Sequence, residues 1–323
     1  MKSPIARLWL GMTLALLTGI ACAQTFPAKP IRWIVPYAPG GGQDFIARTI
    51  GAQMSIDGGQ PVVIENKPGG NSSVAASDLL RSPADGYTVM SIDNGHAIFN
   101  PVLYRNLSYN VERDMALVTT TGRIPLLLIA GPGSDATSAT DFIAKAKAAP
   151  GRFNYASPGA GTPHHIAMEL LKQRAAIHVV HIPYRGGAPA LADVAGGQIP
   201  VMIGDLAFSL GFIKAGKVRA LAVADAKRVN ALPDVPTFKE LGVDGMEAVA
   251  FSAVATHGAT PPAVVGALSQ AIARALADPG VAAKLTAASV EPWASTPEAF
   301  RTMVREESRR WHKLIADQGI SVD

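Results

Sequence analysis

A run of three glycines follows a short apolar stretch and could bind an anion. Residues 31–35 read Ile-Arg-Trp-Ile-Val, and the loop after them supplies Tyr37, Pro39, Gly40, Gly41, Gly42 and Asp44. Glycines leave backbone N–H groups uncovered and accept positive φ. A helix expected to begin near Asp44 has unpaired N–H groups in its first turn, and these attract a negatively charged oxygen. Alternatively, the loop is a sharp turn that needs glycine only for its geometry.

Three more glycine-rich loops follow predicted strands, at residues 68–71, 157–162 and 184–187. The first and last of the four loops share a pattern, because Pro36-Tyr37 precedes glycines in one half and Pro183-Tyr184 in the other. Ligands of open parallel sheets bind beyond the carboxyl ends of strands. We therefore expect these loops to face one ligand, with a tyrosine wall from each half.

Polar side chains accompany these loops and complete the candidate binding site. They are Asn94, His96, Ser157, Gly161 (as part of the turn), Thr162, His164, Arg185 and Asp205. Ser157 and Thr162 could equally cap a helix, and Asp205 could be an N-cap. Arg185 is either a surface charge or the partner of a second ligand carboxylate.

The motifs of common catalytic sites are missing. There is no G-x-S-x-G elbow, and the 159–164 run begins like a dinucleotide fingerprint but ends in His and lacks a P-loop Lys. His165 and Glu169 have the spacing of a metal pair, without H-E-x-x-H or a clear third ligand. We expect a binding protein with no metal or cofactor rather than an enzyme.

Composition indicates a folded chain with a sizeable core. Of 323 residues, 48% are hydrophobic and only 17% charged, which excludes a disordered chain. The formal charge of +4 is spread along the chain without a Lys/Arg run. Nucleic acid is therefore not an expected partner.

The N-terminus resembles an export signal. Lys2 and Arg7 precede an apolar run at residues 8–20, and Ala21-Cys22-Ala23 fits a signal-peptidase site. We expect residues 1–23 to be removed and the mature chain to reside in the periplasm, with a net charge of about +2. Cys22 is the only cysteine, so no disulfide is expected. A lipid anchor at Cys22 is the less favoured alternative, because the preceding residues 19–21 lack the usual Leu or Val.

Short strands alternate with helices of about ten residues, which predicts parallel βαβ units and an α/β fold. Strands are expected at 31–35, 61–64, 87–92, 126–130, 153–156, 179–182, 200–203, 218–223 and 251–255. Helices are expected at 45–54, 73–80, 139–148, 164–172, 188–195, 208–215, 262–277 and 297–315.

The chain is expected to cross twice between two lobes, near residues 122–125 and 231–247. Domain 1 would comprise residues 24–122 and 232–323, and domain 2 residues 123–231. Each lobe would hold a mainly parallel sheet flanked by helices, with a cleft between the lobes. Two crossings make a hinge that suits closure on a ligand.

An ordered set of motifs covers nearly the whole mature chain and resembles one family. The motifs lie at residues 36–44, 65–70, 85–88, 96–101, 155–164, 180–187, 204–205 and 236–242. They resemble the Bug proteins, the TctC-type extracytoplasmic solute receptors of tripartite tricarboxylate transporters. The resemblance implies a two-domain, type II-like periplasmic binding protein. It also implies that a carboxylate is held by residues 37–44 and 157–164, with Asp205 nearby. Relatives more often carry small hydroxyl residues at positions 91–95, so Asp93 and Asn94 are expected to help set ligand identity.

We therefore expect a monomeric receptor that delivers a small carboxylate to the membrane components of such a transporter. An aromatic dicarboxylate such as terephthalate is the first expectation, because Tyr37 and Tyr184 could sandwich a ring while His96 or Arg185 meets the distal carboxylate. Citrate or another di- or tricarboxylate is the next. The alternative from a different class is an exported hydrolase that uses His164 or Asp205.

Overall fold

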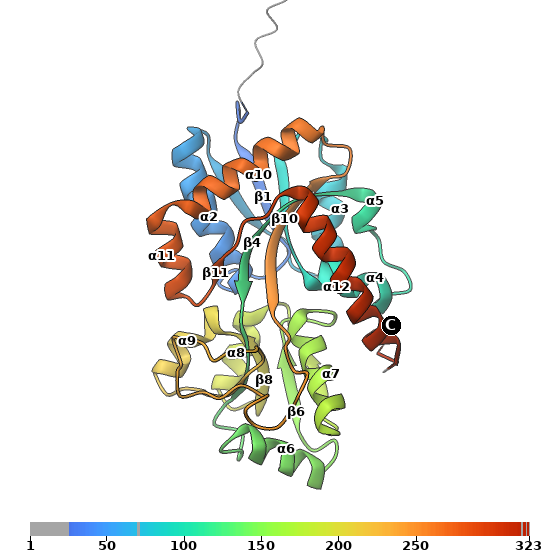
Figure 1. Ribbon diagram of the computed structural model, residues 1–323, viewed down its shortest axis with the longest axis vertical. Helices are drawn as coiled ribbons and strands as arrows, with labels where there is room; N and C mark the ends of the chain where they lie inside the picture. Colours follow the sequence, from blue (N-terminus) through green and yellow to red (C-terminus); the bar gives the residue numbers. More distant parts are fainter. Residues whose placement is uncertain (1–25, 70–71, 318, 321, 323) are drawn as a thin grey trace, which may run out of the picture.

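The computed structural model describes residues 26–69, 72–317, 319–320 and 322. The predicted signal peptide and Cys22 lie outside these residues. Within them the chain forms two β-sheets flanked by helices, and Figure 1 shows one sheet above the other. We name the upper part lobe one and the lower part lobe two.

Lobe one is built from both ends of the described chain. Its sheet has the order β11-β4-β10-β3-β1-β2. The strands are β1 (Ile31–Val35), β2 (Val62–Asn66), β3 (Thr88–Asp93), β4 (Met115–Ile124), β10 (Ala250–His257) and β11 (Glu291–Pro292). The helices are α2 (Gly42–Gly58), α3 (Ser73–Arg81), the π-helix η2 (Gly95–Phe99), α4 (Asn100–Leu103), α5 (Val111–Asp114), α10 (Pro262–Ala277), α11 (Pro279–Ala287) and α12 (Pro297–Asp317).

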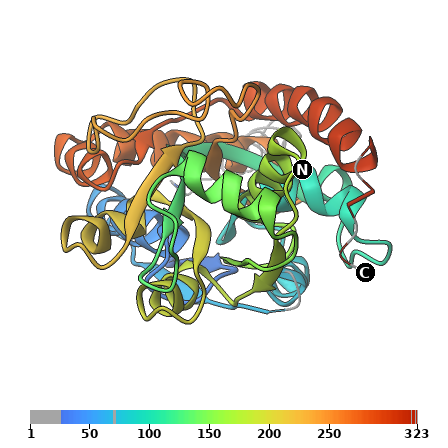
Figure 2. The same ribbon diagram turned by 90° about the horizontal axis from the view of Figure 1, so that it is seen from below.

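Lobe two is built from one continuous stretch. Its sheet has the order β7-β6-β8-β5-β9. The strands are β5 (Leu126–Ala130), β6 (Asn154–Ser157), β7 (Val180–Pro183), β8 (Val201–Asp205) and β9 (Arg219–Val223). The helices are α6 (Ala139–Ala148), α7 (Pro163–Ala175), α8 (Gly187–Ala195) and α9 (Leu206–Lys214), and Figure 2 views this lobe from below.

The predicted α/β class is confirmed, but the strand pairing needs a correction. The strands β1, β2 and β3 pair in parallel, as do β6, β7 and β8. However, β5 and β10 pair antiparallel with both neighbours, so each sheet is mixed rather than mainly parallel. The reason is the chain path: β5 and β10 are the strands by which the chain enters a new lobe. They run away from the other lobe, whereas β1, β3, β6 and β8 end facing it.

The sequence prediction missed strand β4. No strand was expected between residues 92 and 126, because the Thr run at 119–121 carries no apolar signal. The structure continues β4 through this run to Ile124, and Thr119, Thr120 and Thr121 are fully buried. A β-branched side chain favours the extended backbone, which explains why threonine suits a central strand.

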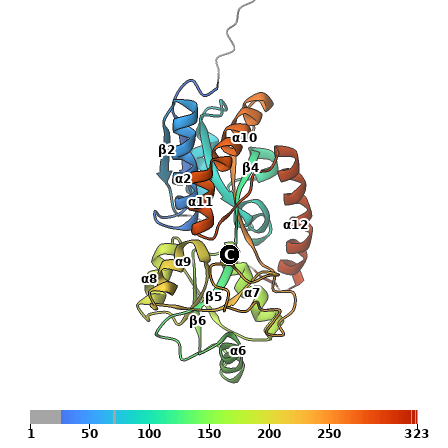
Figure 3. The same ribbon diagram turned by 60° about the vertical axis from the view of Figure 1, so that its left-hand side comes forward.

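Two segments connect the lobes. Pro125 alone separates β4 from β5, and residues 224–249 lead back from β9 to β10. Arg123, near the end of β4, bonds both carboxylate oxygens of Asp225 at 2.9 Å and so ties the two connections together. Figure 3 shows α10, α11 and α12 returning to lobe one. The domain boundaries drawn from the sequence remain predictions.

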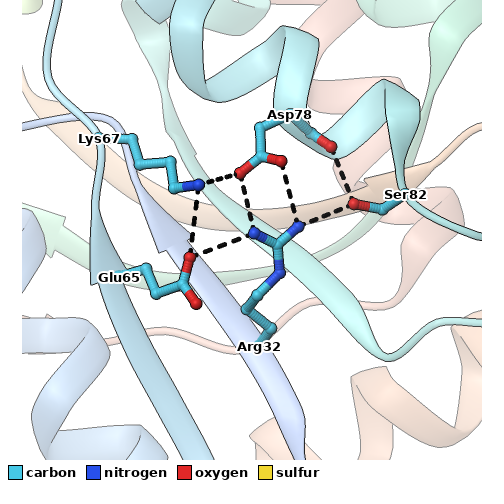
Figure 4. Close-up of polar contacts among 5 residues, drawn as sticks. All are labelled: Arg32, Glu65, Lys67, Asp78 and Ser82. Carbon is cyan, nitrogen blue, oxygen red and sulfur yellow. Dashed lines mark hydrogen bonds and ion pairs between the residues drawn. The ribbon is translucent and has the colours of Figure 1, made fainter.

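A charged network fixes the loop that leads from β2 toward the cleft (Figure 4). Arg32 on β1 donates to Asp78 at 2.8 Å and to Ser82 at 2.8 Å. Lys67 contacts Asp78 at 2.5 Å and Glu65 at 3.5 Å. Because these groups are partly exposed, the network contributes mainly by holding the chain around Lys67 in place.

Candidate functional site

A cavity of about 390 Å³ lies between the lobes. Its size falls in the range of small-molecule sites, roughly 300–1,000 Å³. It is lined by Pro36, Tyr37, Pro68, Gly69, Ser72, Gly95, His96, Asn100, Pro158, Gly159, Ala160, Gly161, Thr162, Pro183, Tyr184 and Arg185. The loops after β1, β2, β3, β6 and β7 therefore meet here, as the sequence predicted for strand ends of an α/β sheet.

The lobe-one wall carries a buried Tyr–Asp–His group. Tyr37 donates its hydroxyl to Asp93 at 2.5 Å, and His96 Nδ1 lies 2.7 Å from the other oxygen of Asp93. Burial works against the charged form of Asp93, but its contacts with the adjacent His96 and the hydrogen bond from Tyr37 lower its pKa below the usual value. Burial and the charge of Asp93 raise the pKa of Tyr37, which keeps the phenol protonated as a donor.

Two buried polar atoms on this wall have no partner among the described residues, namely His96 Nε2 and Asn100 Oδ1. His96 is 1% and Asn100 4% exposed, and both residues line the cavity. The other end of the Asn100 amide donates to Tyr109 at 2.9 Å. Since the Tyr109 hydroxyl can donate or accept, either end of the amide can face the cavity. A buried polar atom without a partner is costly, so these two atoms indicate where a ligand binds.

The lobe-two wall is a backbone turn that opens a helix. Gly161 has φ +74, in the left-handed region that glycine adopts without strain. Thr162 caps α7, since its hydroxyl accepts the N–H of His165 at 3.4 Å. Arg185 is exposed, and it has no acidic partner in the part of the chain that the structure describes. It is therefore available to a ligand at the cavity edge.

The two walls touch each other at several points. Ala38 donates its N–H to the Arg185 carbonyl at 3.4 Å. A Cβ on Gly95 would lie 2.7 Å from the Gly161 carbonyl, so only glycine fits at this approach. The lobes are thus closed around the cavity.

Ser157, a predicted ligand contact, points inward instead. Its Oγ lies 2.6 Å from His181 Nε2 and accepts the N–H of Gly159, and the residue is fully buried. The His181 ring stacks between Tyr155 and His165, at centroid distances of 4.8 and 4.2 Å. Burial lowers the pKa of His165 to about 4 and that of His181 to about 3, so both rings are neutral at neutral pH. Ser157 therefore supports the turn at Gly159 from behind.

A second, much smaller cavity of about 30 Å³ also lies between the lobes. The glycine loop at the start of α2 and two predicted polar residues of lobe two reach this cavity instead of the larger one. Gly41, Gly42, His164 and Asp205 line it, together with Tyr37, which reaches both cavities. His164 Nε2 lies 2.8 Å from Asp205 Oδ1. A Cβ on Gly42 would lie 2.8 Å from Asp205 Oδ2, so the Asp205 carboxylate sits close to the first turn of α2. The position that we predicted for a ligand anion thus already faces a carboxylate of lobe two.

Besides Ser157, four predicted site residues line neither cavity. Pro39 and Gly40 are exposed. Asp44 is buried and accepts the Gly40 N–H at 3.0 Å and Arg48 at 3.0 Å, which holds the loop in shape. Asn94 bonds the backbone of β10 rather than facing the cavity.

Asn100 is a site residue that the sequence prediction missed. It lies four residues after His96, a spacing that puts two helical side chains on one face. That signal was present in the sequence, but no helix was expected at residues 95–103. The structure forms η2 and α4 there and brings both side chains to the cavity.

Metal binding and membrane insertion find no support in the part of the chain that the structure describes. No group of three or more His, Cys, Asp or Glu side chains there could hold a metal ion. Glu169, which together with His165 has the spacing of a metal pair, accepts hydrogen bonds from Lys172 and Tyr155. No described helix combines the length and apolarity needed to span a bilayer.

Comparison with known proteins relates the chain to solute receptors. The family described as tripartite tricarboxylate transporter family receptor matches residues 46–320. A Rhodopseudomonas palustris protein solved with adipate is 33% identical with a TM-score of 0.88, and the match covers 92% of this chain and 99% of that one. The periplasmic binding protein BugD is 28% identical with a TM-score of 0.87, covering 92% and 99%. MatC of Rhodopseudomonas palustris, solved with bound malate, is 28% identical with a TM-score of 0.85, covering 90% and 100%.

Proposed function

Because the chain belongs to the tripartite tricarboxylate transporter receptor family, we propose that it captures a small dicarboxylate between its lobes and presents it to the membrane components of such a transporter. The family is one of receptors, not enzymes, and the resemblance predicted from the sequence is confirmed. The two similar proteins solved with adipate and malate make a carboxylate plausible here too.

The charge of the cavity lining is the observation that carries the proposal. Among the described residues, the lining includes one guanidinium, Arg185, and one titratable imidazole, His96, but no Asp or Glu. A cavity with this lining favours an anion. Arg185 and His96 come from different lobes, so each could hold one carboxylate of the same ligand.

The apolar part of the lining favours a ligand with an apolar middle. Tyr37 and Tyr184 line the cavity from opposite lobes, and four prolines, Pro36, Pro68, Pro158 and Pro183, supply rigid hydrocarbon walls. Burying a ring or methylene chain against such walls contributes roughly 25 cal/mol per Å². We therefore place an aromatic dicarboxylate first, as the sequence suggested, and an aliphatic one such as adipate next. Citrate ranks below these, because the described residues of the lining offer no basic side chain besides Arg185 and His96 for its third carboxylate.

Capture needs no covalent step. Closure removes water from the carboxylates, and hydrogen bonds and charges of the two walls replace it. A ligand can shift the protein from open to closed only by binding the closed form more tightly. The contacts between Ala38 and Arg185, and between Gly95 and Gly161, are formed only when the lobes meet, which supports this coupling.

The location and assembly of the protein follow from the same proposal. BugD is described as periplasmic, and the N-terminal 23 residues read as a cleavable export signal. We propose that the mature receptor works as a periplasmic monomer with the two-domain division given above. No nucleic acid takes part.

A thermal-shift panel followed by titration calorimetry tests the proposal. The panel contains terephthalate, phthalate, adipate, malate and citrate, with monocarboxylic benzoate as a matched control. A true ligand at 100 times its Kd should stabilise the protein by about 2.7 kcal/mol, and chromatography should recover it unchanged. Conversion of the ligand would support the exported hydrolase instead, and a panel without any stabilisation would refute dicarboxylate capture.

A further inference from the structure

The imidazole of His96 is buried, and one of its nitrogens has no hydrogen-bond partner among the described residues. This points to a role beyond shaping the cavity. The nitrogen is Nε2, and His96 lines the cavity although it is only 1% exposed. A nitrogen in this position must meet a ligand atom or remain desolvated without a bond.

The contacts of the other nitrogen, Nδ1, decide whether Nε2 is a hydrogen-bond donor or an acceptor. His96 Nδ1 lies 2.7 Å from Asp93 Oδ1, and the Asp93 N–H points at the same nitrogen from 3.2 Å. The shorter contact, to a charged oxygen, decides which tautomer is present. An unprotonated Nδ1 at 2.7 Å from a carboxylate oxygen would set two lone pairs against each other. We therefore assign the proton to Nδ1, and the neutral ring then presents only a lone pair at Nε2.

A ligand carboxylate cannot sit against that lone pair. If Nε2 gains a proton, however, the imidazolium lies between two carboxylates, that of Asp93 and that of the ligand, and donates to both. Without a ligand, the same Nε2–H would be buried with nothing to accept it. Protonation of His96 and binding of a carboxylate at this wall therefore favour each other, and such coupling is reciprocal.

Resting on the function proposed above, we propose that His96 takes up one proton from solvent when a dicarboxylate binds, so that capture is proton-linked. His96 thus makes binding depend on the charge of one ligand carboxylate, and Asp93 fixes the orientation of the His96 ring. A ligand group that carries its own hydrogen, such as a hydroxyl, would not need this proton.

The groups around the ring agree with this assignment. The charged and titratable ones on the neighbouring elements are Asp93 on β3, Tyr37 after β1, Tyr109 before α5, Asp205 and Arg185 from lobe two, and His312 on α12. His312 Nε2 contacts the Ile98 carbonyl at 2.7 Å, not the His96 ring. Tyr37 and Tyr109 are held protonated by raised pKa values, so Asp93 is the anion in direct contact with His96.

Calorimetry in paired buffers measures the proton directly. Terephthalate and adipate are titrated into the wild-type protein at pH 8 in phosphate and in Tris, whose ionisation enthalpies differ. The slope of the binding heat against ionisation enthalpy should correspond to an uptake approaching one proton, and Kd should rise by up to about tenfold per pH unit on the alkaline side.

Variants assign the proton to a residue. His96→Gln should lose proton uptake and weaken binding by about 10- to 100-fold, since a bond to a charged group is lost. The exposed His178→Gln is the matched control and should keep both wild-type values. Equal heats in the two buffers with binding intact, or proton uptake that survives in His96→Gln, would overturn this inference alone. A wild-type protein that binds no dicarboxylate would overturn it together with the proposed function.

Discussion

Adding one methyl group at Gly42 should weaken ligand binding without harming the fold. Gly42 begins α2 in lobe one, and its missing Cβ leaves room for Asp205 of lobe two. An alanine Cβ would lie 2.8 Å from Asp205 Oδ2, well inside the 3.4 Å at which ordinary contact begins. In an open protein the two residues separate, so the clash opposes only closure.

The magnitude follows from what Asp205 must give up. The methyl group can be accommodated if the Asp205 carboxylate turns away. However, Asp205 is only 6% exposed, and its carboxylate bonds His164 at 2.8 Å. Loss of a buried hydrogen bond to a charged group costs about 1.5–3 kcal/mol. Because the cost falls on the closed form, the Kd of Gly42→Ala should rise by about 10- to 100-fold.

Stability should move in the opposite direction. Alanine is a better helix former than glycine, so the free energy of unfolding of the ligand-free variant should stay the same or rise by up to about 0.5–1 kcal/mol. The urea midpoint should stay the same or rise accordingly. Gly266→Ala in α10 is the matched control, because a Cβ there meets nothing within 4 Å. Titration calorimetry and urea unfolding measure the two effects. Wild-type affinity in Gly42→Ala would refute the argument that this contact belongs to the closed, ligand-binding form.

Three further predictions test the surrounding structure. Gly161→Ala should destabilise the free protein by about 1 kcal/mol or more in urea unfolding, because φ is +74, in a region that alanine adopts only with strain; unchanged stability would contradict the turn geometry. The free energy of unfolding should fall as pH drops from about 6.5 toward about 3. The reason is that His181 is protonated first in the unfolded chain, whereas burial lowers the pKa of the folded ring to about 3. His181→Phe should flatten this pH dependence, and a dependence as steep as in the wild type would assign it to other groups. Arg123→Ala should cost about 1–2 kcal/mol, since it leaves Asp225, 9% exposed, without its two 2.9 Å bonds; urea unfolding indistinguishable from wild type would show that the bridge adds no stability.

Local sequence signals predicted the elements that border the site. The apolar run 31–35 became β1 with the bounds expected, and the helix expected at 45–54 is α2, which begins three residues earlier at Gly42. Glycine loops after strands were correctly placed at the cleft, because strand direction in βαβ units puts those ends on one side. The Thr run of β4 and the π-helix η2 escaped prediction, since neither has an apolar period of its own.

The sequence placed backbone segments at the cavity more accurately than it placed side chains, and the ligand contacts themselves stay predictions. Tyr37, Gly161, Thr162 and Arg185 line the main cavity as expected. Ser157 occupies the predicted strand end, yet its side chain turns toward His181 behind the turn. Side-chain direction at a strand end depends on the pairing register and on what packs behind it, and the local sequence specifies neither.

The sequence by itself determined the class, the family and the meeting of glycine loops between two lobes, because these depend on period, glycine placement and an ordered set of motifs. Tertiary structure alone decided how the predicted residues divide between two cavities. It set the α2 glycine loop against Asp205 rather than against open space, and it left His96 Nε2 and Asn100 Oδ1, in two residues that line the larger cavity, without partners among the described residues. The physical reason is that these pairings join residues far apart in the chain, and they form only when two separately folded lobes close on each other.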